Sequence, residues 1–249
     1  MIENLGIAQF QPHIKALESG YGHTTQQAEA VIQSGLLFIN QLPSIQYSRG
    51  AFLCQEELPV ETIHVLRRGH VIIFRFDDSG NRRISEIASP MTIIGGGILH
   101  GSEEHDYYAT VFTDVCEAQP MSTGDLSKGF KNNPQVELFF HVDHAVQLAK
   151  WNRHFWEWGM KSVPARLAGA LLYVLELQDT LPFHYFPQRT LAELAGTTRE
   201  SAVVVLRALR REGVLSWRKS QSPELLDEDA LEQIYREKLE LRYLPKAEL

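Results

Sequence analysis

The chain has 249 residues, of which 44% are apolar and 22% are charged, with 24 Lys and Arg against 31 Asp and Glu. This composition is typical of one or two globular domains and excludes a disordered or collagen-like chain. The longest apolar stretch, near residues 167–177, is much shorter than the roughly 20 residues that span a bilayer. The N-terminal residues lack a basic segment followed by an apolar one, so we expect a cytoplasmic protein without a membrane partner.

The strand-forming part of the chain lies between residues 45 and 116, where short β-branched and aromatic runs alternate with turn signals. In the run VIIFRF, Val71, Ile73 and Phe74 cannot all fall on one alternating face. We therefore expect antiparallel strands with at least one strand buried on both sides, as in a small barrel. Residues 78–80, Asp-Ser-Gly, predict a hairpin turn because glycine adopts positive φ without a steric penalty.

The two cysteines, Cys54 and Cys116, are too few for a disulfide framework or a structural zinc site, and we expect both to be buried. Residues 24–39 look helical, although the sequence assigns no role to the first 40 residues.

After Pro134 the apolar residues step by four and three, which predicts a helix over residues 135–162, roughly 40 Å long at about 1.5 Å per residue. Such a helix needs a surface to lie on. That surface is either a second copy of the chain, which we favour, or the chain's own core. The seam residues are Leu138, Val142, Ala145, Ala149, Asn152, Trp156 and Gly159.

Residues 189–215 have the pattern of a helix-turn-helix motif, in which Gly196 permits a tight turn and Thr197 can cap the second helix. The inward face of the second helix is expected to hold Ala202, Val205, Leu206 and Leu209. A Ser-, Gln- and Pro-containing stretch between two apolar pairs follows, and it predicts a hairpin that serves as a wing.

The N-terminal end of the second helix exposes the residues that suit DNA recognition. Arg199 suits a guanine and Glu200 a cytosine, while Ser201 suits a phosphate. Glu200 has an alternative role, a capping box with Thr197 that reads no base. The full set of predicted DNA-binding residues is Gln188, Arg189, Thr198, Arg199, Glu200, Ser201, Arg218 and Lys219.

The charge distribution agrees with this prediction. Residues 1–182 carry 13 basic and 20 acidic side chains, whereas residues 183–221 carry 7 and 3, and residues 222–249 carry 4 and 8. A ligand-binding module without DNA recognition has no reason to concentrate positive charge in one short region. The sequence has no HExxH, GxSxG, P-loop or paired-carboxylate motif. We therefore expect no catalytic residue and no enzyme.

The chain resembles the CRP/FNR family of bacterial transcription regulators over nearly its whole length. The family's order of parts is also found here: the strand region comes first, then the long helix, and then the segment LAELAGTTRESAVVVLRALRREGVL. The resemblance implies an α+β fold with three parts. An antiparallel jelly-roll β-barrel with an N-terminal helical segment covers residues 1–133, a dimerisation helix covers 134–163, and a C-terminal winged helix-turn-helix domain covers 164–249.

The resemblance also implies the function of a homodimer that binds a palindromic site on double-stranded DNA. A small-molecule effector bound between barrel and helix would reorient the recognition helices, and RNA polymerase would be a partner if the protein activates transcription. The alternative is a ligand- or haem-binding sensor of the same architecture without sequence-specific DNA recognition.

Three positions depart from the family's pattern. Val204 stands where family recognition helices usually carry a second Arg. Gly95-Gly96 and Tyr107-Tyr108 stand where members that bind cyclic nucleotides carry a ribose-binding Glu and a phosphate-binding Arg. Because Tyr cannot replace the charge of a bidentate Arg, we expect a member outside the cyclic-nucleotide subgroup, with no tight binding of cAMP or cGMP.

The effector expected instead is a small aromatic or other non-nucleotide molecule. The predicted effector-binding residues are Gly95, Gly96, Gly97, Tyr107, Tyr108, Thr110 and Trp151. The alternative for the aromatic residues is packing in the core and at the dimer seam. No cofactor or metal is expected: His141 or His144 could supply one axial ligand to haem, but no second ligand is recognisable.

Overall fold

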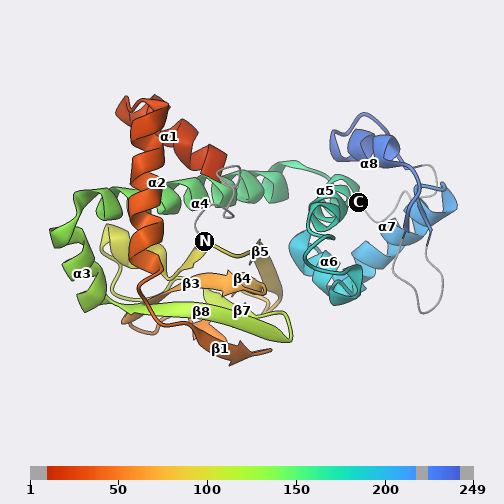
Figure 1. The fold of residues 1–249 in the computed structure, drawn as a ribbon. Helices are drawn as coiled ribbons and strands as arrows, with labels where there is room; N and C mark the ends of the chain where they lie inside the picture. The colour runs from red at the N-terminus through yellow and green to blue at the C-terminus, as the bar shows by residue number, and fades with distance from the viewer. Residues whose placement is uncertain (1–9, 217–223, 242–249) are drawn as a thin grey trace. The chain divides into compact units, whose positions relative to one another are not determined.

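The structure is a computed structural model that describes residues 10–216 and 224–241 (Figure 1). The contacts between residues divide the chain into two compact units. Of the described residues, those up to Ile73 and those in Ile87–Asn152 form the first unit. Phe74–Glu86 and the described residues from Arg153 onward form the second.

The strands form two four-stranded sheets whose order is β1-β8-β3-β6 in one and β2-β7-β4-β5 in the other. Each sheet pairs strands from opposite ends of the strand region, which is the arrangement of a jelly roll and confirms the predicted fold class. The strands are β1 (Ile45–Ser48), β2 (Phe52–Cys54), β3 (Thr62–Arg68), β4 (Val71–Phe76), β5 (Arg82–Ala88), β6 (Ile93–Ile94), β7 (Tyr108–Val111) and β8 (Val115–Ser122).

Details of the strand region also match the sequence-based predictions. The first four residues of β4, Val71 to Phe74, are all buried, so this strand is covered on both faces. The predicted turn at residues 78–80 is present, with Gly80 at φ 76° and its N–H donating to the carbonyl of Asp77 over 2.8 Å. Both cysteines are buried as expected.

Four helices belong with the first unit or begin there: α1 (Gln11–Tyr21), α2 (Thr25–Ile39), α3 (Thr123–Asn132) and α4 (Pro134–Met160). Thr24 caps α2, and its hydroxyl and the side chain of Gln27 form a reciprocal capping box. A short 3-10 helix, η2 (Gly96–His100), follows β6. The bounds of α4 confirm the predicted long helix to within two residues at each end.

The two helices among the first 40 residues have a clear structural role, because α1 and α2 lie against the first half of α4 (Figure 1). Gly35 of α2 lies directly beside the ring of Phe139. His13 Nε2 is 3.0 Å from Asp143 Oδ1, and both side chains are buried. The chain's own N-terminal helices therefore cover the part of α4 that begins at Pro134.

This packing corrects part of the predicted dimer seam. Val142 is 1% exposed and belongs to the chain's own core, against which Leu138 also packs. Val142 is therefore not available to a second copy, and Leu138 is partly covered by the chain's own core. The remaining seam positions are exposed: Ala145, Ala149, Asn152, Trp156 and Gly159.

The second unit holds the C-terminal helices and a short hairpin. Its elements are α5 (Val163–Glu176), η3 (Phe183–Tyr185), α6 (Gln188–Leu194), α7 (Arg199–Arg211), β9 (Leu215–Ser216), β10 (Glu224–Leu225) and α8 (Glu228–Tyr235). The antiparallel pair β9 and β10 confirms the predicted wing, although Arg218 and Lys219 lie outside the described residues. None of the helices in the described ranges has the length and apolar character needed to cross a bilayer.

The contact between α2 and α4 leads to a stability prediction. A Cβ added to Gly35 would overlap the ring of Phe139, whereas one added to Gly20 in α1 would meet nothing within 4 Å. We expect Gly35→Ala to lower the free energy of unfolding by about 1–3 kcal/mol, because overpacking exceeds the gain in helix propensity. Gly20→Ala should leave it unchanged or raise it by up to about 1 kcal/mol. Urea unfolding of both variants provides the measurement, and equal stabilities would contradict the packing.

Candidate DNA interface and effector site

The N-terminus of α7 is capped by Thr198. Its hydroxyl accepts a hydrogen bond from the backbone N–H of Ser201 over 3.2 Å and donates to Ser201 Oγ over 3.0 Å. The predicted cap at Thr197 is therefore wrong by one residue, because Thr198 is the residue in extended conformation just before the helix. Glu200 is consequently the second helical residue and not the third, so it cannot complete the proposed capping box.

The two faces of α7 differ sharply. The predicted inward residues Ala202, Val205, Leu206 and Leu209 are all buried, which confirms that face. Arg199 and Glu200 are exposed at the N-terminal end, and Ser201 is half-buried beside them. The helix thus presents a guanidinium, a carboxylate and free backbone N–H groups at one end, and these groups suit base edges and phosphates. Val204 is half-buried on the same helix.

Glu193 is a site residue that the sequence did not reveal. It is 6% exposed at the end of α6, and its carboxylate accepts hydrogen bonds from Arg82 Nε over 2.9 Å and Arg82 Nη2 over 2.5 Å. Arg189 Nε donates to the other oxygen over 3.2 Å. Arg189 is exposed and Gln188 half-buried at the start of α6. No local pattern signals the pair, because Arg82 lies 111 positions earlier in the chain.

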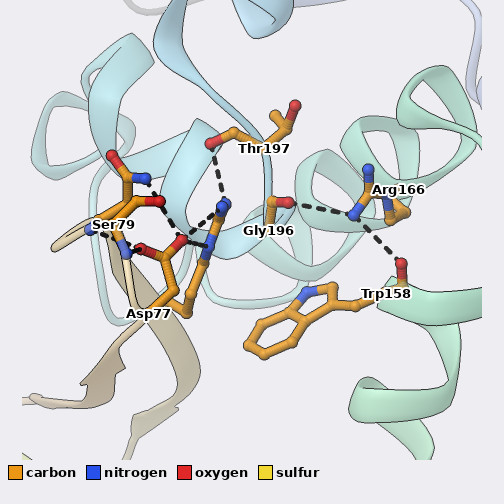
Figure 2. Close-up of polar contacts among 8 residues, drawn as sticks. Asp77, Ser79, Trp158, Arg166, Gly196 and Thr197 are labelled. Carbon is orange, nitrogen blue, oxygen red and sulfur yellow. Dashed lines mark hydrogen bonds and ion pairs between the residues drawn. The ribbon is translucent and has the colours of Figure 1, made fainter. Parts of the chain in front are cut away.

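The turn between α6 and α7 is fixed by hydrogen bonds to its carbonyl oxygens (Figure 2). Trp158 Nε1 donates to Leu194 O over 3.1 Å. Arg166 Nη1 donates to Gly196 O over 3.0 Å and to Trp158 O over 3.2 Å, so one guanidinium bridges the turn and the end of α4. Gly196 has φ +58°, a backbone conformation that favours glycine. A Cβ at this position would lie 3.1 Å from the Trp158 indole, so the space also requires glycine.

The hairpin between β4 and β5 supplies the remaining donor. Arg83 Nη1 donates to Thr197 O over 3.2 Å, and Arg83 Nε donates to Asp77 Oδ2 over 3.0 Å (Figure 2). Asp77 Oδ1 also accepts from the backbone N–H of Asn81 over 2.8 Å. Hydrogen bonds from Asn81 and Arg83 hold the pKa of the Asp77 carboxyl below its usual value. The carboxylate therefore remains charged and keeps Arg83 directed at the turn.

The predicted effector residues fall into two groups. Gly95, Tyr107 and Trp151 come together: the Tyr107 hydroxyl accepts from the Gly95 N–H over 2.7 Å, and the Trp151 ring meets that of Tyr107 edge-on at 5.3 Å. Gly96 and Gly97 continue into η2 and are buried. Tyr108 and Thr110 alternate along β7 with the buried Ala109 and Val111, so their side chains point to the other face of the sheet.

Several histidines surround the glycine run, a feature that the sequence did not localise. His144 of α4 packs on Gly96, with Nδ1 2.7 Å from where a Cβ on Gly96 would lie, and it stacks on His100 at 5.1 Å. His105 Cε1 is 3.3 Å from the corresponding point on Gly95. These rings come from η2, a loop and α4, so only the folded chain brings them together.

Burial favours the neutral form of two of the nearby histidines, His144 and His64. Burial, with a further contribution from His100, lowers the pKa of His144. Burial and the neighbouring His105 lower the pKa of His64 to about 4. Within the described part of the chain, both ring nitrogens of His144 are buried without a hydrogen-bond partner. The glycine run is therefore bordered by a neutral imidazole whose donor and acceptor are unused.

The position of the α7 cap can be tested by substitution. Thr198→Ala should lower the free energy of unfolding by about 1 kcal/mol, because it removes the acceptor for the Ser201 N–H. Thr197→Ala is the matched control, since the Thr197 hydroxyl makes no hydrogen bond to the residues that the structure describes. Denaturant unfolding measures both, and a larger loss for Thr197→Ala would restore the cap predicted from the sequence.

Comparison with protein families matches residues 165–234 to the Crp-like helix-turn-helix domain. No curated protein matches the chain in a sequence comparison. Among solved structures, FixK2 from Bradyrhizobium japonicum is similar at a TM-score of 0.64 and 19% identity, covering 78% of this chain and 96% of its own. The c-di-GMP-responsive global regulator CLP from Xanthomonas campestris is similar at a TM-score of 0.65 and 18% identity, covering 80% and 99%.

The OCPA complex of CprK is similar at a TM-score of 0.58 and 15% identity, covering 80% of this chain and 92% of that one. At these identities the structural likeness establishes the fold, and the helix-turn-helix match adds the DNA-binding domain. The resemblance predicted from the sequence is confirmed in two respects: residues 165–234 match a Crp-like helix-turn-helix domain, and the chain shares the fold of these similar structures.

Proposed function

We propose that the protein acts as a homodimer that recognises a two-fold-symmetric DNA site and that a small non-nucleotide effector sets its affinity for that site. The observation that carries the proposal is the N-terminus of α7, where Arg199 and Glu200 are exposed above a fully buried inner face. A recognition helix contacts base edges with this end. The hydrogen bonds to the preceding turn support it, because base reading requires a precisely held helix.

Each group at this end has a distinct role in the proposal. Arg199 donates two hydrogen bonds to a guanine, and Glu200, released from any capping box, accepts from a cytosine. Ser201, Thr198, Gln188 and Arg189 contact phosphates, as do Arg218 and Lys219 of the wing. Phosphate contacts fix position and carry no sequence information, so specificity rests on the first two residues.

A second copy of the chain is proposed to cover the exposed face of α4. Phe155 is 67% exposed, Trp156 58% and Met160 74%, and they share one helix face with Ala149 and Asn152. Large apolar side chains gathered on one face mark an interaction surface more often than they remain in water. In a two-fold dimer the same face of both copies meets, which places the two recognition helices on successive half-sites.

The proposed effector region borders Gly95 and is lined by Tyr107, Trp151 and His144. Its groups are aromatic or neutral, and none supplies the guanidinium that a cyclic phosphate needs. The similar structures are described with different ligands, c-di-GMP responsiveness for CLP and bound OCPA for CprK, so the fold alone does not choose the ligand. The residues here favour a small aromatic or other non-nucleotide molecule over cAMP or cGMP.

The binding of effector and the binding of DNA are proposed to be thermodynamically coupled. An effector that binds one arrangement of the two recognition helices more tightly than the other changes the DNA affinity by the same factor. The competing function is a sensor module that no longer reads sequence. Val204 favours it, since a half-buried valine stands where a second base-reading Arg is usual in the family. Sequence selection separates the two functions.

Selection of bound duplexes from a randomised pool, at fixed moderate salt, should enrich a two-fold-symmetric site. On that site Arg199→Ala should cost about 1–3 kcal/mol and relax the preference at one base position in each half-site. Arg207→Ala, an exposed arginine two turns later on the same helix, should leave the preference unchanged. An unaltered preference in the Arg199 variant would falsify the assignment of α7 as the recognition helix.

The dimer surface is tested by Trp156→Glu, which places a charge at the centre of the exposed face of α4. We expect the dimer dissociation constant to rise about tenfold or more, because buried tryptophans often dominate an interface. Lys150→Glu, on the same helix and also exposed, is the charge-changing control and should have little effect. Sedimentation equilibrium measures both variants, and identical dissociation constants would exclude this face.

A further inference from the structure

A cavity that belongs to neither the DNA interface nor the effector region lies in the angle between α3 and the start of α4. Its volume is about 430 Å³, within the range of about 300–1,000 Å³ typical of small-molecule sites. Ile98 and Leu99 of η2 and Leu126 and Phe130 of α3 form its apolar walls. All these residues lie in the first unit, so the cavity does not depend on how the two units are arranged.

One side of the cavity is polar in an ordered way. Thr123, Ser127 and Lys131 line it at successive turns of α3, four residues apart, so two hydroxyls and one ammonium follow one edge of the helix. Leu126 and Phe130 occupy the neighbouring edge. A face that is apolar along one edge and polar along the other suits an amphipathic ligand.

The charged residues of the lining come from two helices, and their positions orient a ligand. Glu137 and His141 also line the cavity, and their side chains face each other at 3.9 Å across one turn of α4. The ammonium of Lys131 and the hydroxyls of Thr123 and Ser127 make no hydrogen bond or ion pair with any other residue in the described ranges. The edge of the cavity on α3 therefore carries an unpaired positive charge, whereas the Glu137 carboxylate lies on the α4 side.

We infer that this cavity binds a small amphipathic carboxylate. Its carboxylate would accept hydrogen bonds from Lys131 and the nearest hydroxyl, and its apolar body would lie against Ile98, Leu99 and Phe130. The geometry supports this because a charge-assisted hydrogen bond fixes the head group while burial of the chain supplies most of the affinity. The inference is independent of the proposed effector region at Gly95.

The site is placed to influence that region. Ile98 and Leu99 belong to the same five-residue helix, η2, as Gly96, on which His144 packs, and His100, on which His144 stacks. A ligand that displaces η2 therefore alters the contacts of His144. Occupancy of the cavity and occupancy of the effector region are coupled through one short helix.

The test is a titration of the full-length protein, labelled at Ile and Leu methyl groups, with octanoate below its micelle concentration. The methyl signals of Ile98, Leu99 and Leu126 should shift and saturate together. In Lys131→Met the concentration for half-saturation should rise about three- to fivefold, the effect of losing one exposed charge pair. Lys128→Met, an exposed lysine of the same helix that does not line the cavity, should leave it unchanged.

The uncharged analogue 1-octanol separates the head group from the apolar chain. It should shift the same methyl signals with equal half-saturation in the wild type and in Lys131→Met. Octanoate that shifts no signals, shifts only signals far from the cavity, or binds equally to wild type and Lys131→Met would overturn the inference. None of these outcomes bears on DNA recognition, since selection of a duplex site uses α7 and can succeed or fail independently.

Discussion

The carbonyl oxygens of the turn between α6 and α7 are the point on which the placement of the recognition helix depends. The last carbonyls of a helix have no partner within the helix. Here the carbonyl that ends α6 receives Trp158 from the end of α4, and the two turn carbonyls receive Arg166 of α5 and Arg83 of the β4–β5 hairpin. Two of these donors are themselves held, Arg83 by Asp77 and Arg166 by the carbonyl of Trp158. The helix that follows is therefore oriented by bonds to segments far apart in the sequence.

The proposed effector region shows the opposite situation, because its polar groups are only partly satisfied. The Tyr107 hydroxyl fills the space next to Gly95, whereas His144 rests on Gly96 with both ring nitrogens unpartnered among the described residues. Leaving a buried polar group without a partner costs about 1–3 kcal/mol. A ligand that offers His144 a donor or an acceptor recovers part of this cost, so the imidazole favours a ligand with a hydrogen-bonding group.

Local patterns predicted the elements well. Three predictions rested on patterns that act within a few residues, and all three were confirmed. They are the turn at Gly80, the long helix after Pro134 and the buried face of α7. The cap of α7 was misplaced because two threonines are adjacent and propensity alone does not choose between them. Backbone conformation decides, and only Thr198 has the extended conformation at the helix start.

The relations that the sequence could not predict are those between distant segments. The Arg82–Glu193 ion pair and the packing of Gly35 on Phe139 join residues about 100 positions apart, and no spacing rule connects them. The seam prediction failed at Val142 for the same reason, since a helical period shows which residues share a face but not what covers it. Tyr107 and Tyr108 were grouped as neighbours in sequence, although Tyr107 is buried in the core and Tyr108 lies on the less buried face of β7.

The covering of the first half of α4 by α1 and α2 has a consequence for how the regulator responds to its own abundance. Of the predicted seam, only the positions from Ala145 onward are exposed and open to the proposed second copy, and a shorter apolar contact would give a weaker association. When the chain concentration is below the dimer dissociation constant, the amount of dimer grows with the square of that concentration. For the proposed dimer, occupancy of a two-fold DNA site would then change more steeply than protein abundance, and a modest change in expression would become a larger change in regulation.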